Sequence, residues 1–379
     1  MTESVFIRRE PVVNRQKAIT ATRVIVPAET ATAAAAILSE LAPVWPMARS
    51  VFVSLGDTLP DAGLLAWTPP ENAMVEIPAE TLVASPTQDL IGRLTAQGTP
   101  LCLASWAPGM QLPADAQYRF VLADARLHPK VRNAPGIVLA EGLASHQEFA
   151  TAMESGYAGA AGWFFLHGLP VSDKINPGHA QIMRVLNLVR HNAEIRDIEA
   201  ALKQDVTLSY KLLRYINSVG FGLSCEIQSF KHAVTILGYD KLNKWLSLLL
   251  VTASKDPAAP ALMQTAIARG RFMEIVGHSF FDKSQLDNLF ITGSFSLLHV
   301  LLGTHMDKVL GEMHLPEAIA DALLHDHGIF APFLGLALAC ESDDPAALAA
   351  KAEALQLTAA QVNAAQLEAL AFADSLQFN

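Results

Sequence analysis

Two hydrophobic patterns follow one another along the chain. From Val5 to about Phe165, short apolar runs recur at 5–7, 19–26, 51–55, 73–77, 100–104, 118–123, 136–140 and 159–165. Many are continuous apolar stretches, as in strands buried on both faces of a parallel sheet, and the segments between them can hold helices or short crossovers. Thr30 is a suitable N-cap for one such helix, over 31–41. Eight strands predict a reduced (β/α)8 TIM-like barrel with some helices short or missing, because the region is far shorter than the ~250 residues typical of that fold.

Beyond a stretch with Gly168, Pro170 and Pro177, the apolar positions take a helical period. Ile182, Val185, Leu186 and Val189 are separated by three or four residues, as on one face of a helix. Similar segments predict further helices at 228–237, 240–253, 257–282, 288–302, 332–340, 344–354 and 359–376. The fold class is therefore multidomain, α/β plus all-α, with a barrel at 1–168 and a helical domain at 169–379.

Composition narrows the range of functions. The chain of 379 residues has a net charge of −10 and a pI near 5.6, which opposes nonspecific binding to nucleic acid. Its three cysteines, Cys102, Cys225 and Cys340, are far apart, so we expect neither a disulfide framework nor a zinc cluster. The N-terminal residues lack the pattern of a signal peptide, and no segment reads as a membrane span. We expect a cytoplasmic protein without a membrane segment.

The predicted strand ends carry an ordered series of short motifs. In chain order these are Arg9–Arg15 with Ala21–Ile25, Phe52–Ser54, Val75–Ile77, Leu103–Trp106, Phe120–Asp124, Leu139–Ala144 and Ala161–Phe165. The series resembles EAL domains, the cyclic di-GMP phosphodiesterases. Where that family has metal-binding or other polar residues, this chain has Arg23, Phe52, Ala104, Ser105, Leu122 and Ala144.

The resemblance thus implies a vestigial barrel site made of Arg23, Glu76, Asp124 and Glu141. A guanidinium cannot ligate a metal ion, because it is always cationic and has no lone pair to donate. The three retained carboxylates could simply neutralise Arg23. Alternatively, Arg23 could hold a phosphate of a bound dinucleotide without cleaving it.

A second resemblance covers nearly all of residues 175 to 375. The segments Asp205–Leu208, Leu212–Ser218, Gly220–Gly222, Glu226–Ser229 and His232–Gly238 occur in the order found in HDOD domains. HDOD domains are related to HD-type phosphohydrolases but lack their His-Asp ligands, and Gly293–Leu297 holds no such pair. All these elements can serve the fold alone. A candidate partner surface comprises Asp205, Arg214, Asn217, Ser218, Lys231, Lys241 and Lys244.

Other histidine motifs do not predict a metal site. Adjacent residues on a helix point about 100° apart, so His325-Asp326-His327 fits a helix end better than a set of ligands. His299 and His305 are six residues apart and fall on different helical faces. The chain also lacks a Walker loop and a dinucleotide-binding glycine fingerprint. We expect no catalytic, metal-binding or cofactor-binding residue.

The resemblances imply a non-catalytic bacterial signal-transduction adaptor that acts through protein–protein contacts. Its partners would be other signalling proteins, and self-association stays open. Two alternatives remain: a cyclic di-GMP receptor that does not hydrolyse its ligand, and a weak residual phosphodiesterase. Neither nucleic acid nor a membrane is an expected partner.

Overall fold

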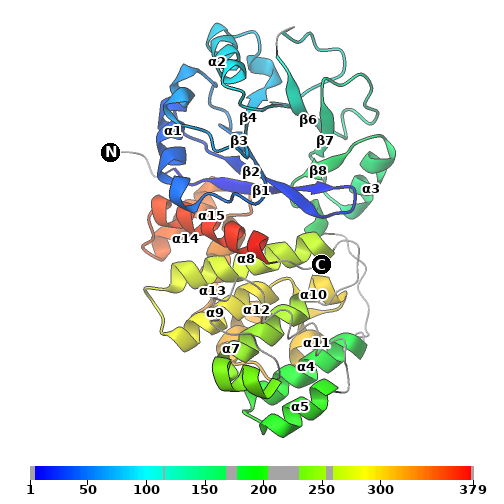
Figure 1. Cartoon of the computed structure of the whole chain (residues 1–379), viewed down its shortest axis with the longest axis vertical. Coiled ribbons are helices and arrows are strands. Elements are labelled where there is room, and N and C mark those ends of the chain that lie inside the picture. Colours follow the sequence, from blue (N-terminus) through cyan, green and yellow to red (C-terminus); the bar gives the residue numbers. More distant parts are fainter. Residues whose placement is uncertain (1–4, 114–115, 168–176, 204–229, 253–258, 377–379) are drawn as a thin grey trace. The chain divides into compact units, whose positions relative to one another are not determined.

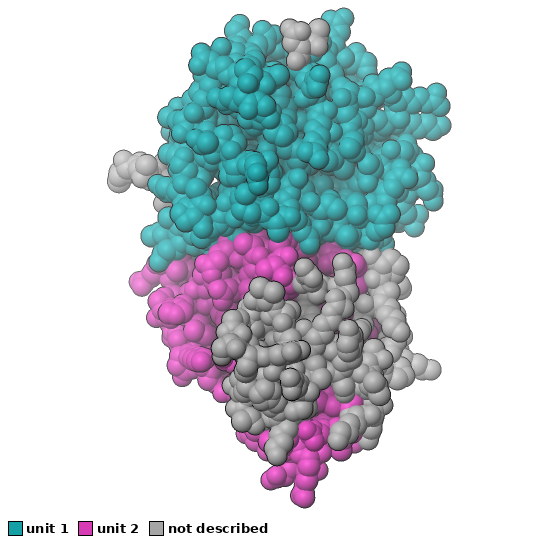
Figure 2. Space-filling model, in the orientation of Figure 1, with its two compact units in different colours: residues 1–168, 339–353, 358–367 teal, residues 169–338, 354–357, 368–379 magenta. Residues whose placement is uncertain are grey.

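The computed structural model describes residues 5–113, 116–167, 177–203, 230–252 and 259–376 (Figure 1). The chain divides into two compact units, coloured separately in Figure 2. The first, the barrel unit, holds residues 1–168, 339–353 and 358–367, and the second, the helical unit, holds 169–338, 354–357 and 368–379. The division between residues 168 and 169 stays a prediction.

The strands of the barrel unit form a closed barrel in the order β1 to β8. They are β1 Arg8–Asn14, β2 Ile19–Ile25, β3 Ser50–Ser54, β4 Ala73–Pro78, β5 Leu101–Ala104, β6 Tyr118–Asp124, β7 Ile137–Glu141 and β8 Gly159–Ala161. β1 runs antiparallel to β2 and β8, and the other pairs are parallel. The predicted barrel is confirmed, but the first strand was wrongly placed at 5–7, because β1 begins at Arg8 and is interrupted by polar residues.

The connections are trimmed, as the short length of this region predicts. Helices or 3₁₀ turns follow several strands: α1 Ala31–Glu40, η1 Ala42–Val44, η2 Ala62–Ala66, η3 Ala79–Thr81, α2 Ser85–Ala96, α3 His146–Glu154 and η4 Phe164–Leu166. The described residues between β5 and β6, and those between β6 and β7, form no helix. The predicted cap of α1 is confirmed, because the Thr30 hydroxyl accepts a hydrogen bond of 3.1 Å from the backbone N–H of Ala33.

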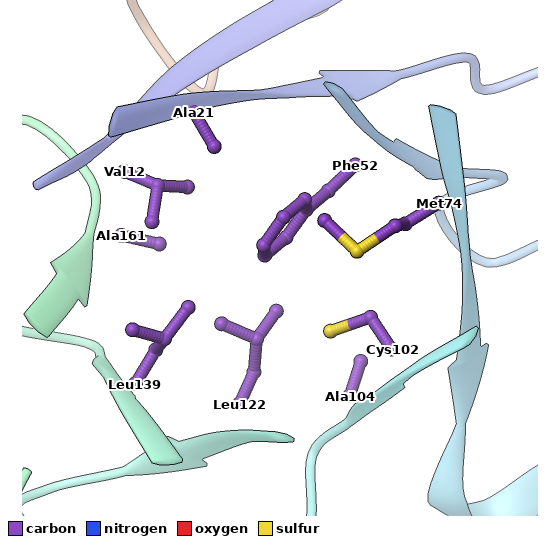
Figure 3. Close-up of a cluster of buried hydrophobic side chains, with 9 residues drawn as sticks. All are labelled: Val12, Ala21, Phe52, Met74, Cys102, Ala104, Leu122, Leu139 and Ala161. Carbon is purple, nitrogen blue, oxygen red and sulfur yellow. The ribbon is translucent and has the colours of Figure 1, made fainter. Parts of the chain in front are cut away.

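Apolar side chains fill the interior of the barrel. Alternate residues of a strand point to opposite faces, so every second residue of each strand points inward. Figure 3 shows the resulting buried cluster, which consists of Val12, Ala21, Phe52, Met74, Cys102, Ala104, Leu122, Leu139 and Ala161. The rings of Phe52 and Phe120 lie 5.2 Å apart between centroids. The lumen is therefore a packed core and offers no channel beneath the strand ends.

The barrel unit also contains segments from the far end of the chain, which include α14 Pro345–Ala354 and the first part of α15 Ala359–Ser375. The Asn363 side chain accepts a hydrogen bond of 2.9 Å from the N–H of Ile7 and donates one of 2.8 Å to the carbonyl of Val5. Arg9 forms a buried ion pair of 2.9 Å with Glu341. These contacts give fixed partners to the residues just before β1 and to the beginning of β1 itself.

The helical unit confirms the predicted all-α fold. Its described helices are α4 Pro177–Arg190, α5 Ile195–Lys203, α7 Phe230–Thr252, α8 Ala259–Gly277, α9 Lys283–Phe295, α10 Leu298–Leu302, α11 Met306–Gly311, α12 Glu317–His325 and α13 Ala331–Ala339. A break within α7 falls at Gly238, whose φ is +74°, where the sequence predicts one helix to stop. α8 and α9 pack closely, because a Cβ on Gly293 would lie 2.7 Å from the Cα of Gly270.

The lengths and hydropathies of the described helices bear on membrane insertion. None of the helices there combines the length and the apolar character that a membrane span requires.

Candidate functional site

The four residues of the vestigial barrel site lie toward the carboxyl ends of their strands. Arg23 lies on β2, Glu76 on β4, Asp124 on β6 and Glu141 on β7. A fifth charged residue, Glu10, joins them from β1, which pairs with β2 so that Glu10 is directly opposite Arg23. In barrels of this kind the carboxyl ends of the strands are where binding and chemistry are built, so these residues define the candidate site.

Arg23 is bound tightly by two carboxylates. Its Nε lies 2.8 Å from Oε1 and 3.0 Å from Oε2 of Glu76, and its Nη1 lies 3.1 Å from Oε2 of Glu10. Glu76 is 1% exposed and Arg23 16% exposed, so the pair is largely withdrawn from water. Burial alone would lower the pKa of Arg23, but the charge and hydrogen bonds of Glu76 together with the charge of Glu10 raise it above its usual value. Arg23 is thus a fixed cation.

The pKa of Glu141 is raised well above that of an ordinary glutamate. Burial raises its pKa from 4.5 to about 7, with Arg23 opposing the shift and the carboxylates Glu76 and Glu10 adding to it. Near neutral pH, Glu141 is therefore divided between its neutral and ionised forms. A carboxyl in this state can donate a hydrogen bond or carry a negative charge, depending on pH.

Asp124 is held by a neighbour in its own turn. It accepts hydrogen bonds from the backbone N–H of Arg126 at 2.8 Å and from Nη2 of Arg126 at 3.2 Å. Burial would raise the pKa of Asp124, but these hydrogen bonds and the charge of Arg126 lower it. Of the predicted site residues, Arg23 and Glu76 are in direct contact, and Asp124 is paired with Arg126.

The side chains around this site do not fit the divalent metal ions that the resemblance to EAL domains would imply. Such ions need several oxygen donors that converge on one cavity. Here Glu76 forms an ion pair with Arg23, and Asp124 forms one with Arg126. Phe52, Ala104 and Leu122 offer no oxygen donor from their side chains, because they belong to the apolar core. Within the described part of the chain, no group of three or more His, Cys, Asp or Glu residues could hold a metal ion. No step of metal-dependent hydrolysis can be assigned to these residues.

Glu10 is the functional residue that the sequence reasoning missed. The sequence motifs point to the carboxyl ends of parallel strands, whereas Glu10 reaches the site from an antiparallel strand. A hairpin between 8–14 and 19–25, with Lys17 in the turn, would have placed Glu10 opposite Arg23. Opposite charges at facing positions of an antiparallel pair are the signal that could have identified it.

The candidate partner surface of the second domain is described in part. Asp205, Arg214, Asn217 and Ser218 lie outside the described residues, as does the side chain of Lys231 on α7. Lys241 on α7 is exposed.

Lys244 on the same helix has partners within the helical unit. It forms ion pairs with Glu274 and, at 3.1 Å, with Asp287, and its ammonium lies 4.3 Å from the centroid of the Phe290 ring. Burial raises the pKa of Asp287 despite the opposing charge of Lys244. Lys241 is therefore better placed than Lys244 to contact a partner.

The histidine triplet lies at a helix end, as the sequence predicts. His325 is the last residue of α12, and Asp326 follows in the left-handed conformation with φ +53°. The ring Nδ1 of His327 contacts the carbonyl of His325 at 2.6 Å. His299 lies on α10 and His305 caps the next helix, α11. These four histidines thus lie within helices or at helix ends, as their spacing in the sequence predicts.

Comparison with known proteins gives a family match and two curated relatives. The HDOD domain family matches residues 177–312. The cyclic di-GMP phosphodiesterase CdgJ of Vibrio cholerae serotype O1 is 27% identical over 208 residues, which cover 54% of this chain and 48% of CdgJ. The uncharacterized protein YuxH of Bacillus subtilis is 24% identical over 213 residues, or 55% of this chain and 52% of YuxH. The chain spans about half the length of these relatives.

Among solved structures, the chain is similar to EAL proteins, with low TM-scores and low sequence identity. The EAL domain of FimX from Pseudomonas aeruginosa, bound to c-di-GMP, has a TM-score of 0.32 and 16% identity over 44% of this chain and 91% of that one. Klebsiella pneumoniae BlrP1 has a TM-score of 0.34 and 14% identity over 43% of this chain and 55% of that one. The identification therefore rests on the HDOD match, the curated relatives and the closed barrel itself. The chain contains an HDOD domain at 177–312, and the eight-stranded barrel before it supports its identification as an EAL–HDOD protein.

Proposed function

We propose that the chain is a non-catalytic adaptor in bacterial signal transduction, with a degenerate EAL barrel and an HDOD domain that act through protein–protein contacts. The observation that carries the proposal is the ion pair between Arg23 and Glu76, backed by Glu10. It puts a fixed cation where the related enzymes have a metal-binding glutamate. The proposal places the protein in the cytoplasm, and the free, buried thiols of Cys102 and Cys340 support a reducing compartment.

Electrostatics explain why Arg23 weighs against hydrolysis. A divalent cation near Arg23 would meet a positive charge in a poorly hydrated setting, where repulsion is less screened than in water. It would also compete with Arg23 for Glu76, whose two oxygens are already hydrogen-bonded. The barrel is instead suited to serve as a rigid scaffold, because its lumen is packed and its charged residues have internal partners.

A hydrolysis assay tests the absence of catalysis. Purified full-length protein is incubated with cyclic di-GMP and Mg²⁺ or Mn²⁺, and the linear dinucleotide is measured. We expect no product above the protein-free control. Turnover that disappears in Glu76→Gln but persists in the exposed-site variant Glu80→Gln would contradict the proposal and indicate a residual phosphodiesterase.

A co-precipitation from the native cell tests the adaptor role itself. Full-length protein should retain a defined partner, and the charge reversal Lys241→Glu should weaken this retention. Lys351→Glu on α14 makes the same charge change at another exposed position and should not. If no partner is retained while circular dichroism shows an intact fold, the adaptor proposal fails.

A second candidate function is a cyclic di-GMP receptor that does not cleave its ligand. It is favoured by the guanidinium of Arg23 at the strand ends, since guanidinium geometry suits phosphate. Calorimetric titration separates the two functions. The adaptor proposal expects no heat at high micromolar cyclic di-GMP, whereas the receptor expects binding that Arg23→Met abolishes.

A further inference from the structure

The beginning of β1, which carries Glu10, is paired with another strand along one edge. β2 pairs with β1 from Arg8 to Val13, whereas within the described residues the ladder with β8 includes only Val12 to Asn14. A strand segment with one neighbour opens more readily than a segment that is paired on both edges. The position of Glu10 therefore depends on what else holds the residues around it.

Two side-chain amides of α15 hold the residues just before β1. Asn363, which is 3% exposed, accepts a hydrogen bond of 2.9 Å from the N–H of Ile7 and donates one of 2.8 Å to the carbonyl of Val5. Gln366, which is 1% exposed, donates to the carbonyl of Ile7 at 3.1 Å. Both main-chain groups of Ile7 thus bond to one helix, which lies beside β1 in Figure 1. Separating α15 from this segment would leave buried main-chain groups without partners, which is costly.

Arg9 extends this hold into β1 itself. Its guanidinium forms an ion pair of 2.9 Å with Glu341, and both side chains are buried. It also lies 5.3 Å from the centroid of the Trp163 ring, which follows β8. Successive residues of a strand point to opposite faces, so Arg9 and Glu10 point apart. Arg9 contacts the C-terminal part of the barrel unit, and the very next residue contacts Arg23.

We propose that Glu341, Asn363 and Gln366 form an internal latch on the barrel. By fixing residues 5–9, the latch holds Glu10 against Arg23 and keeps the strand ends in their ion-paired state. When the latch opens, Arg23 keeps Glu76 but loses Glu10, and Nη1 of Arg23 becomes available to an anion. The charge of the candidate site is thus controlled by residues from the other end of the chain.

The course of α15 gives the latch a way to respond to the rest of the protein. The helix belongs to the barrel unit up to Leu367, and its remaining residues belong to the helical unit. An event that shifts α15 would therefore act on residues 5–9 and through them on Glu10. This inference rests on the charge network of the strand ends and not on the proposed adaptor function.

Hydrogen–deuterium exchange on the full-length protein tests whether the latch holds the start of β1. Asn363→Ala removes two hydrogen bonds to residues 5–7, so exchange of the backbone amides of residues 5–9 should become about tenfold faster or more. Gln147→Ala removes an exposed amide from α3 in the same unit and is the matched control. It should change the exchange of residues 5–9 by less than about twofold.

A double-mutant cycle tests the link from the latch to Glu10, which a purely local structural role would not affect. Glu10→Ala should lower the urea midpoint of the wild type, because Arg23 loses a carboxylate partner. In the Asn363→Ala background that loss should shrink to about half or less, since Glu10 is then no longer held against Arg23. In the Gln147→Ala background the full loss should remain.

Two results would overturn the proposal. Exchange of residues 5–9 that is no faster in Asn363→Ala than in Gln147→Ala would show that α15 does not hold this segment. An equal loss of urea midpoint for Glu10→Ala in all three backgrounds would show that Glu10 is positioned without the latch. If Asn363→Ala does not fold, Gln366→Met, which removes a single hydrogen bond and keeps the side-chain length, replaces it in both experiments.

Discussion

Arg23 in the barrel unit and Arg190 in the helical unit are both largely withdrawn from solvent, but their surroundings differ. Arg23 has Glu76 and Glu10 as partners, and these carboxylates raise its pKa above the usual value. Arg190 has an amide and a carbonyl as partners, and burial lowers its pKa to about 10. The first is a neutralised ion pair, and the second is a cation that donates to the neutral oxygens of Asn243 and His314.

This difference separates a buried cation that is neutralised by carboxylates from one whose partners are neutral. At the barrel strand ends, the charged groups that could bind a metal ion or a phosphate already form ion pairs with one another. At Arg190, by contrast, the hydrogen-bond partners are neutral, and burial lowers its pKa. Burying a charge is costly unless the charge is paired, so removing the two arginines should change stability by different amounts.

The largest expected effect comes from Arg23→Met, which leaves Glu76 buried without its partner. Breaking a buried ion pair in this way should lower the free energy of unfolding by about 4 kcal/mol. Urea unfolding followed by tryptophan fluorescence measures it well, because Trp45, Trp67, Trp106 and Trp163 all lie in the barrel unit.

Two controls make the result on Arg23 specific. Arg93→Met breaks an exposed ion pair with Asp89 and should change stability by less than about 0.5 kcal/mol. Removing both partners, with Arg23→Met and Glu76→Met together, should recover part of the loss because no charge is left buried. If Arg23→Met is as mild as Arg93→Met, the strand ends are not a self-neutralised network.

A second prediction tests what determines the stability lost when a cation is removed: its pairing with carboxylates, or the unit in which it lies. Lys244 in the helical unit has two carboxylate partners, Glu274 and Asp287. Lys244→Met should lower the free energy of unfolding by about 3 kcal/mol, since two partly buried carboxylates would lose their cation. Unfolding followed by circular dichroism measures it, and exposed Lys241 on the same helix gives the control variant Lys241→Met. Equal losses of stability in Lys244→Met and Lys241→Met would contradict this explanation.

The sequence predicted the barrel well because most of its strands carry their own signal. A strand such as β5, Leu101–Ala104, is buried at every residue and is a continuous apolar run, so it can be recognised without knowledge of its neighbours. β1 lacks such a signal, because Arg8, Arg9 and Glu10 interrupt it and their partners are distant in sequence. The apolar run at 5–7 therefore drew the prediction to the wrong residues.

The contacts of the site were less predictable than its residues. Glu76 and Arg23 could be named from strand ends, but their ion pair depends on barrel closure, and Glu10 enters through antiparallel pairing. The partners of Ile7 were also invisible, because Asn363 is 356 residues away along the chain. Its signal is a buried amide within the apolar stripe of α15, which predicts a polar partner without saying which one.

A third prediction concerns pH and Glu141. The folded protein holds the proton of Glu141 up to about pH 7, whereas the unfolded chain loses it near the ordinary pKa of 4.5. Stability that depends on this proton therefore falls as pH rises through that window and is lost above it. Between pH 5 and pH 8, the wild type should lose about 2 kcal/mol more stability than Glu141→Gln does. Urea unfolding at the two pH values measures this; if Glu141→Gln and the exposed control Glu80→Gln show the same pH dependence, Glu141 is not a neutral acid in the folded state.

The smallest effect on stability is expected for Arg190→Met. The substitution removes two hydrogen bonds to neutral groups, but it also removes the cost of burying a cation, so the free energy of unfolding should change by less than about 1 kcal/mol. Thermal unfolding followed by circular dichroism measures it, with Arg196→Met on the exposed face of α5 as the control. A loss of stability as large as that of Arg23→Met would show that Arg190 is held by an internal charge after all, and the contrast between the two arginines would then fail.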